Sequence, residues 1–182
     1  MLYSQFGDEV ITAGIDLSLT STGLCIGGQV SSIRSKLRGH QRLIEIRDEL
    51  IKRLTEGNVE IVALEGYSFS SRFSHAHSIG ELGGVVKVAL AESGIKVVTI
   101  PPTNRAKFAT GRGNASKDEV VAAVLSMTKI EKQPGLDDLC DAWVLEQMLR
   151  YILGERTLSL SDKQVSAVEA ISYLEEENTD GI

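Results

Sequence analysis

The chain has 182 residues, of which 42% are hydrophobic, and a formal net charge of −6 at pH 7. This length is sufficient to bury the core of one α/β domain. No apolar run reaches the roughly 18 residues that a membrane-spanning helix needs, and the N-terminus lacks a basic region followed by an apolar block. We therefore expect a soluble, cytoplasmic protein with no membrane partner. The acidic balance argues against a generic nucleic-acid binder, because affinity for phosphate comes from Lys and Arg.

The negative charge is concentrated at the C-terminal end. Residues 160–182 contain six acidic side chains and one basic side chain, a net −5, which leaves about −1 on the first 159 residues. We divide the chain into a domain over residues 1–155 and an acidic C-terminal extension over residues 156–182. Two runs without acidic residues remain in the domain, and they contain Arg34, Lys36, Arg38 and Arg42, then Arg105, Lys107, Arg112 and Lys117.

The first third of the chain reads as three antiparallel strands and a helix. Apolar residues at Ile11, Ala13 and Ile15, followed by a polar turn and a second β-prone run, predict a hairpin with a buried first strand. The Gly27-Gly28 turn then introduces a third strand over residues 29–33. Apolar positions at helical spacing predict a helix over residues 40–54.

The rest of the chain alternates strands and helices. Residues 59–64 form an uninterrupted β-branched run typical of a buried parallel strand, and residues 66–77 read as a loop. A helix over 79–91, a strand over 96–100, a short helix containing Lys107, a helix capped by Ser116 and a last helix over 136–153 follow. This order predicts an α/β fold in which a mixed five-stranded sheet, three antiparallel strands and then parallel strands, carries helices on both faces.

Four acidic side chains fall at matching places in this plan. Asp16 and Glu65 end two core strands, at the edge where open α/β sheets place their sites. Asp138 and Asp141 are three residues apart in the first turn of the last helix and so share one face. Four carboxylates without Cys or His ligands suit Mg²⁺ or Mn²⁺. Two such ions about 3.5–4 Å apart would support phosphodiester cleavage, whereas the alternative for the helix pair is a favourable interaction with the helix dipole.

Asp137 competes with Asp138, because it lies four residues before Asp141 and also shares its face. After Pro134-Gly135 we expect Leu136 or Asp137 to cap the helix, and a capping carboxylate turns back toward its own helix. This favours Asp138 as the metal ligand.

Together these pieces resemble the RuvC family of Holliday-junction resolvases, which have the ribonuclease-H-like fold. The resemblance is carried in order by Gly14-Ile-Asp16 with Gly23, by Ala63-Leu-Glu65, by Lys107 with Gly111-x-Gly113 and Lys117, and by Asp138-x-x-Asp141-Ala142. It covers roughly residues 11–153. The family often has Asp-Pro-Gly where this chain has Asp16-Leu-Ser, which together with the acidic tail suggests a divergent, phage-encoded member.

The resemblance implies a Mg²⁺-dependent endonuclease that resolves four-way DNA junctions by paired nicks. It implies a homodimer with two Mg²⁺ ions per site, replaceable by Mn²⁺. Asp16, Glu65, Asp138 and Asp141 would then be metal ligands, and Lys107 and Lys117 would contact DNA near the scissile phosphate. We also expect DNA contacts from Arg72, Arg105 and Arg112, base stacking by Tyr67 and Phe69, and dimerisation through the helix over 79–91, whose Gly83-Gly84 pair permits close approach.

Three other interpretations stay open. A ribonuclease-H-like nuclease that processes RNA is the main competitor, and a non-catalytic nucleic-acid-binding module of the same fold would have no reason to keep four acids at one edge. The segment from Asp16 to Gly23 also resembles the phosphate loop of actin-like sugar kinases, but those proteins need a chain about twice as long.

Overall fold

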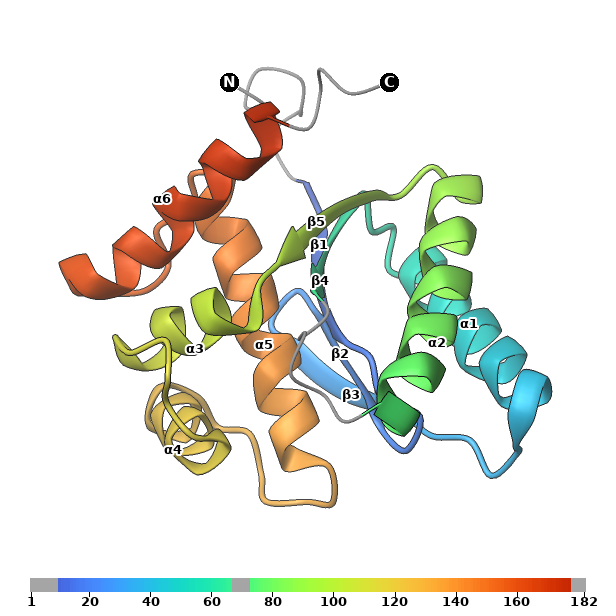
Figure 1. Cartoon of the computed structure of the whole chain (residues 1–182). Coiled ribbons are helices and arrows are strands. Elements are labelled where there is room, and N and C mark those ends of the chain that lie inside the picture. The colour runs from blue at the N-terminus through green and yellow to red at the C-terminus, as the bar shows by residue number, and fades with distance from the viewer. Residues whose placement is uncertain (1–9, 67–72, 178–182) are drawn as a thin grey trace.

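The computed structural model describes the backbone of residues 10–66 and 73–177, and the side chains of these residues except 73–76 and 172–177. A five-stranded sheet runs through the molecule (Figure 1). Its strands lie in the order β3-β2-β1-β4-β5, with β1–β2 and β2–β3 antiparallel and β1–β4 and β4–β5 parallel. The predicted mixed sheet is therefore confirmed. The strand bounds are β1 Thr12–Asp16, β2 Thr22–Ile26, β3 Gln29–Ile33, β4 Ile61–Glu65 and β5 Lys96–Ile100.

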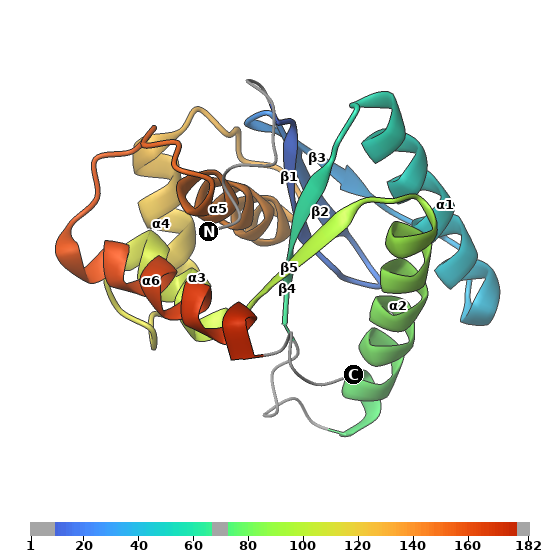
Figure 2. The ribbon, with the colours of Figure 1, turned by 90° about the horizontal axis from the view of Figure 1, so that it is seen from above.

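Helices cover both faces of the sheet, as predicted. Figure 2 shows α1 and α2 together on one face and α3 to α6 on the other. Within the described residues, no helix is both long and apolar enough to cross a membrane. The helix bounds are α1 Gly39–Glu56, α2 Phe73–Glu92, α3 Pro102–Thr110, α4 Lys117–Met127, α5 Leu136–Ile152 and α6 Asp162–Glu177.

The three central strands β1, β2 and β4 are buried on both faces because their apolar side chains alternate between two cores. Leu24 and Val62 belong to the core under α1 and α2, whereas their neighbours Cys25 and Ala63 belong to the core around α5. Successive side chains of a strand point to opposite faces, so one strand can supply both cores. Cys25 and Cys140 are both buried free thiols.

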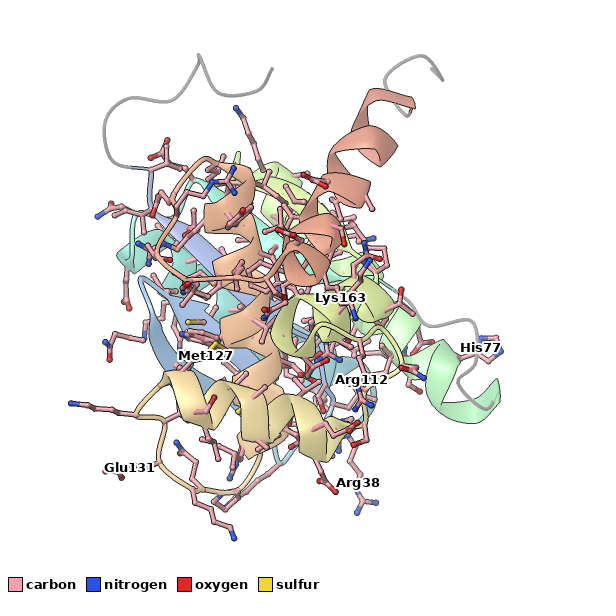
Figure 3. The ribbon with its side chains drawn as sticks, turned by 90° about the vertical axis from the view of Figure 1, so that its left-hand side faces the viewer. Arg38, His77, Arg112, Met127, Glu131 and Lys163 are labelled. Carbon is pink, nitrogen blue, oxygen red and sulfur yellow. The ribbon has the colours of Figure 1, made fainter. Side chains whose placement is uncertain are left out.

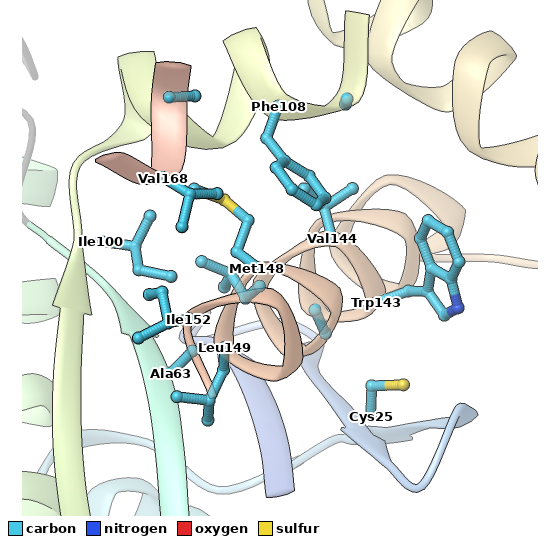
Figure 4. Packing of buried hydrophobic residues seen from close by; sticks show 14 of the residues in the cluster. Cys25, Ala63, Ile100, Phe108, Trp143, Val144, Met148, Leu149, Ile152 and Val168 are labelled. Carbon is cyan, nitrogen blue, oxygen red and sulfur yellow. The ribbon is translucent and has the colours of Figure 1, made fainter. Parts of the chain in front are cut away.

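The second core packs α3, α4 and α6 around α5. In Figure 4, Phe108 of α3 and Val168 of α6 pack toward Val144 and Met148 of α5. Asn104 donates a hydrogen bond to the Ala167 carbonyl at 2.9 Å, which links α3 to α6. The segment expected as an acidic extension thus contains a helix whose apolar face is part of the second core.

Two predicted boundaries are wrong. Helix α2 begins at Phe73 rather than at residue 79, so it includes the end of the segment predicted as a loop, and the exposed His77 lies on it. Its first residues, Phe-Ser-His-Ala-His-Ser, carry no helical apolar periodicity, so the sequence pattern does not indicate where the helix begins. Gly135, with φ 74°, precedes α5 as its N-cap, and no side chain caps this helix, so the predicted cap at Leu136 or Asp137 is absent.

Candidate active site

The two strand-end acids lie side by side. Strands β1 and β4 are parallel with Ile15 opposite Leu64, which places the next residues, Asp16 and Glu65, together at the edge of the sheet. Ile15 and Leu64 face the core under α1 and α2, so Asp16 and Glu65 point to the face that α5 covers. Asp16 is only 8% exposed.

Helix α5 brings the other two acids to the same edge. Asp138 and Asp141 lie in its first two turns, and Asp141 is 3% exposed. The helix comes this close because β1 and β2 present glycine to it: a Cβ on Gly14 would lie 2.0 Å from the Ala142 carbonyl oxygen, and one on Gly23 would lie 2.1 Å from the Asp138 carbonyl oxygen. The two glycines of the resemblance therefore act by positioning α5.

Arg105 is the unexpected member of the cluster. It lies on α3, is 8% exposed, donates from Nε to Glu65 Oε1 at 2.5 Å and pairs through Nη1 with Asp141. The basic run that contains Arg105 predicts this residue at a DNA surface. The structure instead places its guanidinium among the acids.

The four carboxylates are chemically suited to a divalent cation, but they are not arranged as a preformed metal site. Four carboxylates are the hard oxygen ligands that Mg²⁺ and Mn²⁺ prefer. Among the described residues, however, no three His, Cys, Asp or Glu side chains stand where they could hold a metal ion. Arg105 occupies Glu65 and Asp141, two of the four expected donors.

The cluster raises the pKa values of its aspartates. Burial, followed by the charges of Glu65 and Asp141, raises the pKa of Asp16 well above its ordinary value. Burial likewise raises the pKa of Asp141 to about 7, against the opposing effect of Arg105. The pKa of Asp138 rises to about 6 through burial and the charge of Asp137. These groups hold protons at a pH where an exposed aspartate has lost them.

These shifts predict that the metal-free protein loses stability as the pH rises. The folded state binds protons more tightly than the unfolded chain, so the contribution of Asp138 and Asp141 is complete below about pH 4 and disappears as the pH passes through their folded pKa values of about 6 and 7. We expect a lower melting temperature at pH 8 than at pH 5 in EDTA. Asp141→Asn should reduce this difference in melting temperature. Asp48→Asn changes an exposed side chain outside the cluster and should leave the difference unchanged. A melting temperature that rises from pH 5 to pH 8 in the wild type would contradict the prediction.

The basic side chains that are predicted to contact DNA differ in their surroundings. Lys117 begins α4 and its Nζ pairs with Asp137 Oδ2 at 3.1 Å. Burial lowers the pKa of Lys117, but the hydrogen bond to Asp137 outweighs it and the pKa is raised. Lys107 is half-buried on α3. The exposed Arg112 lies on the loop before α4 (Figure 3) and pairs with Glu119 in the first turn of α4. Tyr67, Phe69 and Arg72 lie outside the described residues.

Ser21 and Arg34 also belong to the site, although no sequence pattern places them there. The Ser21 hydroxyl hydrogen-bonds to the Asp138 carboxylate and lowers its pKa, and Arg34 donates from Nε to Ser21 Oγ at 3.4 Å. Arg34 also contacts the Pro134 carbonyl just before α5. These contacts tie the start of α5 to the first hairpin and so position Asp138. The contacts of Ser21 with Asp138 and of Arg34 with Pro134 join residues about 100 positions apart, so nothing local in the sequence indicates them.

The turn after Asp16 is held by hydroxyl groups. The Ser18 amide donates to Thr22 Oγ1 at 3.1 Å, and the Thr22 hydroxyl donates back to the Ser18 carbonyl at 2.7 Å. This reciprocal pair closes the turn in a chain that has Asp16-Leu-Ser instead of Asp-Pro-Gly.

Sequence comparison links this arrangement to a known family. The family model described as crossover junction endodeoxyribonuclease RuvC matches residues 11–146. A protein of that name from Synechococcus sp. (strain WH7803) is 33% identical over 102 residues, which cover 56% of this chain and 66% of the relative. The relative from Treponema denticola is 30% identical over 141 residues, which cover 71% of this chain and 79% of the relative. The matched part spans slightly less than two thirds of the Synechococcus relative.

Structural comparison agrees with the sequence match on the fold. The structure of Thermus thermophilus RuvC in complex with a Holliday junction substrate matches with a TM-score of 0.65 and 24% identity, covering 81% of this chain and 98% of that one. The structure of the yeast mitochondrial Holliday junction resolvase Ydc2 matches with a TM-score of 0.55 and 10% identity, covering 96% of this chain and 87% of that one. The family model covers well over half of the chain, and the protein therefore belongs to the crossover junction endodeoxyribonuclease RuvC family.

Proposed function

We propose that this chain is a divalent-metal-dependent endonuclease that resolves four-way, or Holliday, DNA junctions by paired nicks. The observation that carries the proposal is the cluster of Asp16, Glu65, Asp138 and Asp141 at one sheet edge in a chain of this family. The names of the relatives from Synechococcus and Treponema denticola, and the junction substrate bound to the Thermus thermophilus protein, support a branched DNA substrate.

The site would bind two Mg²⁺ ions, which Mn²⁺ could replace, through its four carboxylates. When bound, such ions lower the pKa of a water molecule and stabilise the leaving oxygen. The protein itself supplies a rigid support: β1 and β4 fix Asp16 and Glu65, and α5 fixes the other two acids. Lys107 and Lys117 would hold the DNA backbone beside them, since Lys binds phosphate as a compact point charge.

Cleavage of labelled substrates tests the proposal. A labelled four-way junction, a fork, a linear duplex and an RNA duplex are incubated with the protein in Mg²⁺ and, separately, in EDTA. We expect paired nicks in the junction in Mg²⁺ and no cleavage in EDTA. Cleavage of the RNA alone would favour an RNA-processing nuclease, binding without cleavage would favour a non-catalytic module, and activity that survives EDTA would exclude metal dependence.

The two lysines should set the salt dependence of DNA binding. Lys117 is 68% exposed in its side chain, and a lysine that neutralises a phosphate contributes nearly one unit to the slope of log K against log salt. Replacing both Lys107 and Lys117 with Ala should weaken binding to all DNA sequences and lower this slope by about 2. Fluorescence anisotropy at several salt concentrations measures it. The double variant Lys129→Ala with Lys132→Ala, on the loop after α4, is the matched control. Equal slopes for the two double variants would indicate that the DNA binds to another surface.

We further propose a homodimer that packs through the groove between α1 and α2. The groove has a volume of about 570 Å³ and is lined by Leu43 and Arg47 of α1 and by Gly84, Val85 and Val88 of α2. Val88 is 59% exposed, and a Cβ on Gly84 would meet no atom within 4 Å. An apolar ridge beside a glycine suits a two-fold contact between copies, and two sites give the two nicks that one junction needs.

Val88→Arg should therefore shift the protein from dimer to monomer. An arginine at this position brings a long charged side chain into the packed contact between two copies, where its bulk and its desolvation are costly, and the position is exposed enough in one copy for the fold to tolerate it. Sedimentation velocity measures the change. Met127→Arg on α4, where the native side chain is 39% exposed (Figure 3), should leave the dimer intact. A dimer that persists in Val88→Arg, or a wild-type monomer at working concentration, would contradict this interface.

A further inference from the structure

Arg105 makes contacts that differ from those of the surface arginines. It donates from Nε to Glu65 at 2.5 Å and pairs through Nη1 with Asp141, and the charge of Asp16 also acts on it. Its side chain is only 10% exposed. A buried guanidinium is tolerated when it is paired, because removal of its partners would leave an uncompensated charge in the interior.

Helix α3 holds Arg105 in this place. The helix follows β5 directly, and β5 pairs with β4 so that Glu65 lies opposite Ile100. On its other side α3 is anchored to α6, since Gln164 Nε2 donates to the Phe108 carbonyl at 2.9 Å. Ala106 and Phe108 are buried on either side of Lys107. The base of the Arg105 side chain is thus fixed by both the sheet and α6.

Arg105 and a divalent cation would bind the same carboxylate oxygens, those of Glu65 and Asp141. Four carboxylates converge at the edge, and Arg105 contributes one positive charge that is engaged with Glu65 Oε1 and Asp141 Oδ1. The described acidic side chains form no ready-made cage while Arg105 is among them. A cation that takes both Glu65 and Asp141 as ligands has to displace the guanidinium from them.

We propose that Arg105 is a built-in counter-ion of the acid cluster that competes with divalent cations for Glu65 and Asp141 and so lowers the metal affinity of the site. This inference rests on the proposed metal-dependent nuclease. Arg105 acts as a positioning residue: it holds the carboxylates together before metal arrives and yields them when metal binds. The site would then fill its second metal position only at a higher ion concentration than its first.

Metal binding without DNA tests the competition. Mn²⁺ binding is measured by calorimetry and electron paramagnetic resonance for the wild type, Arg105→Met, Arg105→Lys and Arg150→Met. Arg150 is the matched control, an α5 arginine whose Nε pairs with Glu155 at 2.8 Å. We expect Arg105→Met to bind its weakest ion at least about tenfold more tightly, which is about 1.4 kcal/mol, and to melt at a lower temperature in EDTA. Arg105→Lys should lie nearer the wild type, and Arg150→Met should bind metal as the wild type does.

A measurement on the wild type keeps the test independent of how the variants fold. The Arg105 Nε–H group, held by Glu65, should give a nitrogen-15 resonance protected from solvent exchange in EDTA, and saturating Mg²⁺ should remove the protection. Persistent protection at saturating Mg²⁺, or a folded Arg105→Met variant with unchanged or weaker Mn²⁺ affinity, would overturn the inference. A wild type that binds no Mn²⁺ at all would instead overturn the proposed metal site.

Discussion

Asp138→Asn and Asp141→Asn are each expected to remove Mg²⁺-dependent cleavage of a four-way junction. Each change removes the charge of one oxygen donor at nearly constant volume. Loss of a direct ligand should lower the cleavage rate by more than the roughly 10–100-fold that loss of an outer-shell partner typically costs. Cleavage is measured under single-turnover conditions with labelled junction, and circular dichroism checks the fold. Junction binding should persist, because the basic side chains that hold DNA are unchanged.

Asp137→Asn is the matched control for both variants. Asp137 lies in the same turn of α5, but its carboxylate pairs with Lys117, and the two side chains are 43% and 68% exposed. An exposed pair of this kind contributes about 0–1 kcal/mol. Asp137→Asn should therefore leave the cleavage rate within a few-fold of the wild type. An inactive Asp137→Asn together with an active Asp138→Asn would shift the assignment by one residue along α5.

The sequence predicts the sheet and the edge because both follow from local patterns. Alternating and β-branched runs indicate the five strands, and the ends of those runs locate Asp16 and Glu65. Helical spacing places Asp138 and Asp141 on one face without a structure. Helix capping does not distinguish Asp138 from Asp137 as predicted, since Gly135 and not Asp137 is the N-cap of α5. The two residues differ instead in their partners, because the carboxylate of Asp137 is paired with Lys117.

Contacts between residues far apart in the chain could not be predicted from the sequence. Arg105 belongs to a basic run of the kind found on protein surfaces, and only the packing of α3 against α4, α5 and α6 buries it. Glu146 is a similar case: it lies on the predicted last helix, is fully buried, and accepts hydrogen bonds from the Gly28 amide at 3.0 Å and from the Cys25 thiol at 3.0 Å. Its partners lie about 120 residues earlier, so no local pattern distinguishes it from an exposed glutamate.

Gly14→Ala is expected to destabilise the protein and remove its activity together. The added Cβ would lie 2.0 Å from the Ala142 carbonyl oxygen and 2.4 Å from the Glu146 amide nitrogen. Both are backbone atoms of α5, so no side chain can rotate away and the helix itself has to move. Overpacking of a core typically costs 1–3 kcal/mol, and a backbone collision should reach or exceed roughly 3 kcal/mol. Urea unfolding measures the loss in free energy of unfolding.

The loss of activity should follow from the same displacement, because α5 carries Asp138 and Asp141 on its first two turns. Gly23→Ala, whose Cβ would meet the Asp138 carbonyl oxygen at 2.1 Å, should act in the same way from the neighbouring strand. Gly84→Ala, compared at a concentration at which the protein is monomeric, is the control: it meets no atom within 4 Å and should gain up to about 1 kcal/mol from helix propensity. If Gly14→Ala kept the wild-type free energy of unfolding, α5 would not be pressed against β1 as described. If it were destabilised but still bound Mn²⁺ and cleaved junctions at the wild-type rate, the placement of α5 would not control the acids it carries.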